Sequence, residues 1–195
     1  KGRVLVRYSL GRAITHTAGP NPSVGDDLVR WWSAVGARVR EMNGDRAGNF
    51  QLLQATLRTI STSSDGLHDR AEAVASFRLP PWISPSEMHA LCREFAGDAT
   101  LRFEGDEETV VADRASPLVR ALTAAIRAEG AARPALVMKS STSDMNVVGA
   151  RGWWACPIAA YGPGDSTLDH TPHEHIRISE YLRAVRVLTR AIESL

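Results

Sequence analysis

An α+β fold is predicted for about the first 110 residues, because two kinds of hydrophobic spacing follow one another in a regular order. Apolar residues alternate with polar or small ones at 4–10, 53–57, 71–79 and 101–103, which is the period of a half-buried strand. Segments whose apolar residues recur at helical spacing lie between the first and second strands and between the third and fourth. The order β-α-β-β-α-β is that of a ferredoxin-like domain, a four-stranded antiparallel sheet with both helices on one face.

Local signals set the expected ends of these elements. The first helix is predicted over 26–42, and Gly44 follows its last turn. The stretch 61–66 consists of turn-forming residues and separates the second strand from the third. Ser84 and Pro85 are expected to be the N-cap and the first residue of the second helix, since proline fits the first helical position.

The pattern changes after Asp113. A helix is expected to begin at Ser116-Pro117, and a long amphipathic helix is expected to close the chain over 178–192. Between them, the apolar runs 135–138 and 153–161 resemble strands that are buried in a parallel or mixed sheet. Two strands are too few for a stable α/β sheet, so this part is expected to belong to a larger layer whose other strands lie outside the sequence.

Composition narrows the class of protein. The chain has 195 residues, 44% of them hydrophobic and 23% charged, as in ordinary globular proteins. The net charge of +1 argues against a nucleic-acid partner, and no apolar run reaches the roughly 18 residues of a membrane span. Cys92 and Cys156 lack metal-type spacing and are expected to be buried thiols in a reducing, cytoplasmic environment. The chain starts at Lys1 without a methionine, which suggests that an earlier part has been removed.

The densest group of possible metal ligands lies at 169–175, with three histidines, one aspartate and one glutamate. Neutral imidazole and carboxylate are good zinc ligands. Pro172 excludes a continuous helix here, so the two-histidine helical signature of metalloproteases does not apply. The alternative is a solvated polar loop that leads into the last helix.

Three further positions could carry chemistry. His16 is a lone histidine on a loop, and Arg78 lies on the polar face of the third strand. Each could equally be an ordinary surface residue. The hydroxyl-rich run 140–144 follows a predicted buried strand, and ligands of α/β proteins bind at the carboxyl ends of such strands.

Several short motifs resemble, in this order, the zinc-dependent deacylase and peptidase family that includes acetylornithine deacetylase, succinyl-diaminopimelate desuccinylase and carboxypeptidase G. They are spread over the whole chain: Lys-Gly-Arg at 1–3, His-Thr-Ala-Gly-Pro at 16–20, Phe-Arg-Leu-Pro-Pro at 77–81, Thr-Ser-Asp at 142–144, and Tyr-Gly-Pro-Gly-Asp at 161–165 before His-Thr-Pro-x-Glu at 170–174. Within the family, 139–146 and 178–195 look most like the lysine/ornithine hydrolases, which release these amino acids from an amino-group carrier protein.

The resemblance implies a zinc-peptidase domain interrupted by a ferredoxin-like lid that forms homodimers. Residues 1–114 would be the lid, and 115–195 would be the C-terminal segment of the catalytic domain, whose N-terminal half is absent. The intact enzyme would use two zinc ions, with cobalt as a possible substitute, on an acylated small amino acid or a carrier-protein substrate of lysine or arginine biosynthesis. The chain alone is expected to be inactive.

The resemblance also assigns roles to individual residues. His170 matches a metal ligand, His16 matches a lid histidine that stabilises the oxyanion, and Arg78 matches the arginine that binds the substrate carboxylate. Thr142, Asn146 and Gly164 match positions that line the substrate. Two departures are Ser141, where glycine is common, and the Asp-Gly pair at 65–66, near a lid asparagine of other branches. Alternative functions are acetylornithine deacetylase or dipeptidase activity and, in another class, a non-catalytic dimerisation module.

Overall fold

A four-stranded antiparallel sheet occupies the first part of the computed structural model, which describes residues 1–16, 19–130, 134–150 and 156–195. The contacts divide the chain into two units. The sheet unit comprises Lys1–Val110 and Lys139–Arg151, and the helical unit comprises Val111–Met138 and Gly152–Leu195. Each unit is described by itself.

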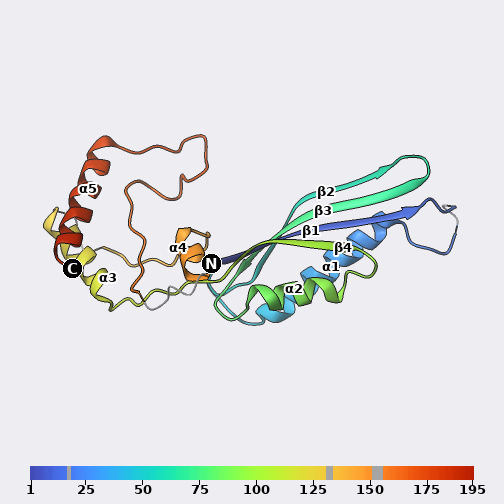
Figure 1. Cartoon of the computed structure of the whole chain (residues 1–195), viewed down its shortest axis with the longest axis horizontal. Helices are drawn as coiled ribbons and strands as arrows, with labels where there is room; N and C mark the ends of the chain where they lie inside the picture. The colour runs from blue at the N-terminus through green and yellow to red at the C-terminus, as the bar shows by residue number, and fades with distance from the viewer. Residues whose placement is uncertain (17–18, 131–133, 151–155) are drawn as a thin grey trace. The chain divides into compact units, whose positions relative to one another are not determined.

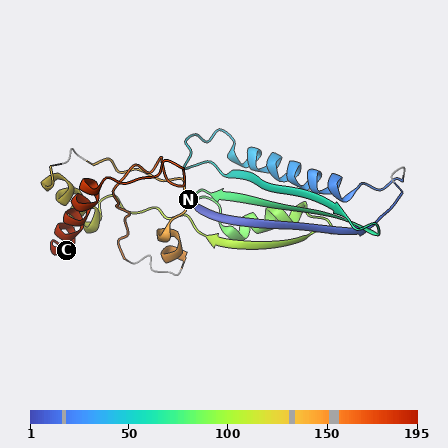
Figure 2. The same ribbon diagram turned by 90° about the horizontal axis from the view of Figure 1, so that it is seen from above.

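The sheet unit contains the predicted order of strands and helices. Its elements are β1 (Gly2–Ala13), α1 (Val24–Asn43), β2 (Gln54–Ser64), β3 (His68–Leu79), α2 (Pro85–Glu94) and β4 (Thr100–Glu107), followed later in the chain by the short α4 (Asp144–Ala150). The strands lie in the order β2-β3-β1-β4, and every neighbouring pair is antiparallel. Both α1 and α2 lie along the same face of the sheet (Figures 1 and 2).

The alternating residues of the strands make the core between the sheet and these helices. Val4, Val6, Tyr8 and Leu10 of β1 are buried, as are the alternate residues of β3 from Ala71 to Leu79. Trp31 of α1 packs on Tyr8 with ring centroids 4.9 Å apart, and its indole N–H donates to the Cys92 carbonyl at 3.0 Å. This bond satisfies the one polar group that the indole carries into the core.

Serine caps determine where the two helices begin. Ser84 and Glu87 form a capping box at the predicted start of α2. Ser23 and Asp26 form another, so α1 begins at Val24, two residues before the predicted start. The serine amide and hydroxyl both donate to Asp26, and these bonds lower the pKa of its carboxyl.

The helical unit is built from α3 (Pro117–Ala128) and α5 (Ile178–Glu193). Ala125 of α3 and Val187 and Ala191 of α5 form its small buried cluster. Glu129 accepts hydrogen bonds from Arg186 Nε at 2.7 Å and Arg190 Nε at 2.6 Å, which joins the end of α3 to α5. These arginine bonds lower the pKa of Glu129.

Two predicted strands are not found in this unit. Residues 135–138 have no regular secondary structure and Leu136, Val137 and Met138 are exposed. Residues 156–161 also lack strand structure, and 151–155 of the second predicted strand lie outside the described residues. A strand needs a hydrogen-bonded neighbour, and the described residues of the helical unit contain none. Cys156 is exposed in this segment, contrary to expectation, whereas Cys92 is buried as expected. No helix in the described part of the chain has the length and apolar character needed to span a membrane.

The helix α4 was not predicted, and Asn146 ties it to the end of β4. Asn146 is only 3% exposed. Its Nδ2 donates to the Glu108 carbonyl at 2.6 Å, and its Oδ1 accepts from the Ser143 amide at 2.9 Å. Both ends of the side-chain amide therefore have main-chain partners, one of them 38 residues away.

We expect Gly2→Ala to destabilise the chain because β1 and β4 approach closely at this position. A Cβ added at Gly2 would lie 2.2 Å from the Glu107 carbonyl oxygen. Such overpacking typically costs about 1–3 kcal/mol, measurable by urea denaturation. Gly11→Ala is the matched control on the same strand, since its nearest neighbour would be 3.8 Å away. Equal unfolding free energies for the two variants would contradict the close approach.

Asn146→Ala is expected to lower the melting temperature. The variant leaves the Glu108 carbonyl and the Ser143 amide without their partner, and an unsatisfied buried polar group costs about 1–3 kcal/mol. Asn21→Ala, in an exposed loop, is the control and should melt like the parent chain. If the two variants melt together, Asn146 does not hold α4 in place.

Candidate functional site

Arg78, Thr142 and Asn146, three of the predicted site residues, lie in the sheet unit at the end of the sheet where β3 and β4 finish. The Arg78 Nη1 donates to the Thr142 hydroxyl. The Thr142 hydroxyl in turn donates to the Lys1 carbonyl at 3.2 Å, so its one proton and one of its lone pairs are both used. This chain of bonds joins residues that are 64 and 141 positions apart in the sequence.

Arg78 occupies the face of the sheet opposite the core, as the sequence pattern predicts. Its neighbours across the sheet are Arg3 on β1 and Gln54 on β2. Burial, followed by the nearby Arg3 charge, lowers the pKa of Arg78, whereas the Glu107 carboxylate acts in the opposite direction. A guanidinium stays charged at any ordinary pH, so Arg78 remains a cation that is partly removed from water and lies near a second cation. Such surroundings favour the binding of an anionic ligand.

Lys1 supports this end of the sheet, although sequence reasoning did not single it out. The residue is 3% exposed. Its Nζ donates to the Asn49 carbonyl at 2.8 Å, to Gln54 Oε1 at 2.9 Å and to the Leu52 carbonyl. Burial and then the Arg78 charge lower the pKa of Lys1 to about 8, while three oxygen acceptors favour its charged form. The Lys-Gly-Arg motif was the one available signal, but it could not reveal these partners.

His16 lies in the exposed loop after β1, and residues 17–18 of its motif lie outside the described residues. The His16 carbonyl accepts a hydrogen bond from the Gly19 amide at 2.7 Å. The expected catalytic role of His16 stays a prediction.

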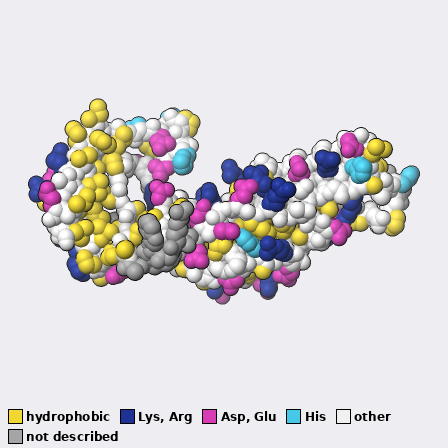
Figure 3. All heavy atoms as spheres, viewed as in Figure 1, with side chains coloured by type: hydrophobic (Ala, Val, Ile, Leu, Met, Phe, Trp, Pro, Cys, Tyr) yellow, Lys and Arg dark blue, Asp and Glu magenta, His cyan; other side chains and the backbone are white. Residues whose placement is uncertain are grey.

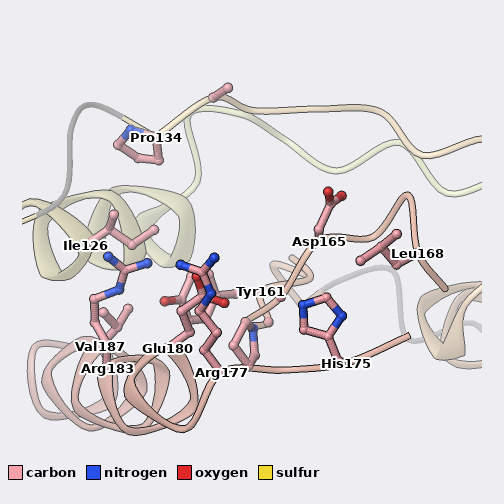
Figure 4. A pocket seen from close by; sticks show the side chains of 14 residues that line it. Ile126, Pro134, Tyr161, Asp165, Leu168, His175, Arg177, Glu180, Arg183 and Val187 are labelled. Atoms are coloured by element: carbon pink, nitrogen blue, oxygen red, sulfur yellow. The ribbon is translucent and has the colours of Figure 1, made fainter. Parts of the chain in front are cut away.

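Gly164 lies on the wall of a pocket of about 560 Å³ in the helical unit (Figure 4). Its φ of +89° lies in the left-handed region that glycine adopts without strain. The side chains of Arg177, Glu180 and Arg183 gather on one side of the pocket, and His175 lies on the other. The pocket therefore combines charges of both signs.

His170, the predicted metal ligand, is exposed on the loop before α5 and also has a positive φ, +63°. Its amide donates to the Glu174 carboxylate at 2.9 Å, which fixes the turn. In the described ranges, no three His, Cys, Asp or Glu side chains are close enough to hold one ion. A zinc site requires three or four protein ligands. The described His, Cys, Asp and Glu side chains therefore do not by themselves fit a metal centre, and His170 is a single candidate ligand.

Comparison with known proteins identifies the family. The model of peptidase family M20/M25/M40 matches residues 6–194. A LysW-lysine hydrolase from Deinococcus radiodurans is 42% identical over 200 residues, covering 100% of this chain and 54% of the relative. A putative LysW-lysine/LysW-ornithine hydrolase from Thermococcus kodakarensis is 55% identical over 83 residues, which cover 43% of this chain and 23% of that protein. The chain thus spans about half the length of the curated relative that it matches throughout.

Solved structures show the same fold at low sequence identity. An M20 family metallo-carboxypeptidase from Sulfolobus solfataricus superimposes with a TM-score of 0.75 at 15% identity, over 98% of this chain and 58% of that one. Human carnosine dipeptidase 1 gives a TM-score of 0.62 at 12% identity, over 99% of this chain and 54% of that one. A family model that matches nearly the whole chain, together with a 42% identical relative aligned along all of it, shows that the chain belongs to peptidase family M20/M25/M40.

Proposed function

We propose that this chain is the lid and the C-terminal catalytic segment of a metal-dependent amide hydrolase that frees the blocked amino group of lysine or ornithine. The observation that carries the proposal is the 42% identity, along the whole chain, to a protein named LysW-lysine hydrolase. A LysW-linked or acetylated amino acid is the corresponding substrate. The reaction belongs to lysine or arginine biosynthesis, in the cytoplasm.

In the proposed division, residues 1–114 form a ferredoxin-like lid and 115–195 return to the catalytic domain. The strand order β2-β3-β1-β4, with two helices on one face, supports the lid. Support for the second part comes from α5, where Ile178, Leu182, Val185 and Ile192 form an exposed apolar stripe (Figure 3). Such a stripe is typical of a surface that another protein layer covers. We propose that the remainder of a longer polypeptide covers it.

At the site, Arg78 is proposed to bind the α-carboxylate that each candidate substrate carries. One nitrogen of its planar fork is occupied by Thr142, which fixes the orientation and leaves the remaining N–H groups for two parallel bonds to a carboxylate. Gly164 and Thr142 would line the substrate. His170 would be one ligand of the two proposed zinc ions, for which cobalt could substitute, and the other ligands would come from the rest of the polypeptide.

Two other functions remain as alternatives. An acetylornithine deacetylase or a dipeptidase would use the same residues on another acyl-amino acid, and comparing kcat/KM for LysW-lysine, acetylornithine and dipeptides separates the three. A dimerisation module without catalysis is the alternative of another class. It predicts that the full reading frame shows no amide hydrolysis with zinc or cobalt on any of these substrates.

Arg78→Ala in the full-length protein is expected to lower kcat/KM by a factor that corresponds to about 2–5 kcal/mol of lost binding free energy in the transition state. This is the usual cost of removing one partner from a desolvated charge pair. Arg78→Lys should restore only part of this loss, since an ammonium cannot form the two parallel bonds. A substrate amide without the carboxylate should be cleaved slowly by both parent and Arg78→Ala. Arg102→Ala, which removes another arginine from the sheet, is the control. Unchanged kinetics with a lowered melting temperature would make Arg78 a structural charge.

His16→Ala is expected to reduce kcat by about 10²–10³-fold without changing the bound zinc, because an oxyanion donor is lost. We propose that the lids form a homodimer in which His16 serves the partner's site. Mixing His16→Ala and His170→Ala proteins should then restore activity, since one site of the mixed dimer keeps both groups. Mixtures as inactive as the separate variants would argue against a shared site.

A further inference from the structure

The amide of Gln54 has an orientation that the surrounding structure dictates. Gln54 begins β2, lies directly opposite Arg78 on β3 and is half-buried. Residues opposite each other in an antiparallel pair have Cβ atoms about 4.5–5.5 Å apart, so the two side chains share one small area of the sheet. The question is which end of the amide, the acceptor oxygen or the donor nitrogen, is available there.

Lys1 answers it. An ammonium group can only donate hydrogen bonds, and it has three protons. The three acceptors around Lys1 Nζ are the carbonyls of Asn49 and Leu52 and the Oε1 of Gln54. A flipped amide would place its own N–H₂ group against the ammonium. One of the three ammonium protons of Lys1 would then have no acceptor. The oxygen of Gln54 must therefore face Lys1, and the Nε2 faces away from it.

The Nε2 is consequently a donor without an assigned acceptor. Within residues 1–16, 19–130, 134–150 and 156–195, no hydrogen bond from Gln54 Nε2 is formed. The charges around the Lys1–Arg78 pair are mostly positive, since Arg78 acts electrostatically on Lys1, and Arg3 and Arg58 act on Arg78. The one carboxylate that acts on Arg78 belongs to Glu107, which is already paired with Arg3 at 2.9 Å. Such surroundings suit an anionic acceptor.

We propose that Gln54 is a further substrate-binding residue, which donates its amide N–H to the carboxylate held by Arg78, and that Lys1 is the positioning residue that fixes the orientation of this amide. The inference rests on the proposed role of Arg78. It adds a second, neutral donor from the neighbouring strand, so that the carboxylate is recognised by both charge and direction.

The test compares Gln54→Met and Lys1→Met, singly and together, in the full-length protein. Both replacements keep an unbranched side chain of similar length. Losing a hydrogen bond to a charged group should raise KM for the carboxylate substrate about tenfold in Gln54→Met, with kcat within about twofold of the parent. Gln51→Met, at an exposed glutamine in the connection just before β2, is the matched control and should leave both constants unchanged.

The double variant separates positioning from general stabilisation. If Lys1 acts through Gln54, Lys1→Met should raise KM in the parent but add little once Gln54 is methionine. Independent, additive effects, or a KM within about twofold of the parent in Gln54→Met, would overturn the inference. Melting temperatures identify a variant that fails to fold. If Lys1→Met fails to fold, the KM of Gln54→Met alone still decides the proposal. An inactive parent, or an Arg78→Ala variant with normal KM, would instead refute the proposed function.

Discussion

The buried ammonium of Lys1 is the constraint on which the proposed substrate end of the sheet unit depends. A charge removed from water must have its hydrogen bonds made elsewhere, or its burial costs several kcal/mol. Lys1 meets this requirement with oxygens from the α1–β2 connection and from Gln54, so the connection must close over the start of β1. The Lys1 carbonyl then accepts from Thr142, which orients Arg78. Through its ammonium and its main-chain carbonyl together, Lys1 thus connects the start of β1 with β2, β3 and the 139–151 segment.

The strands and helices of the sheet unit could be predicted because each carries its own burial pattern. Every second residue of β1 and β3 faces the core, and serine caps mark the starts of α1 and α2. Arg78 was placed correctly on the open face by the same alternation. These signals are local, since they depend on residues within a few positions of one another.

Features that depend on distant partners could not be predicted. The role of Lys1 requires acceptors about 50 residues away, and Asn146 bonds to a carbonyl 38 positions earlier. The apolar run 135–138 has the composition of a strand, but strand structure also needs a neighbouring strand, which composition does not supply. The sequence likewise placed His16, Gly164 and His170 in loops, and loop composition does not determine which side chains converge.

The course of the chain gives the Arg78–Thr142 bond a further significance. Thr142 follows α3 in the sequence, yet its segment, Lys139–Arg151, packs with the sheet unit and not with the helical unit. The chain therefore passes between the units near residues 110, 138 and 151. Arg78 and Thr142 lie inside one unit, so the bond that orients the guanidinium is made within the sheet unit and does not depend on the helical unit. Since a positioned donor contributes to recognition only while its geometry is kept, the segment that holds Thr142 beside Arg78 contributes to the proposed binding of the substrate carboxylate, although in sequence it follows the proposed lid.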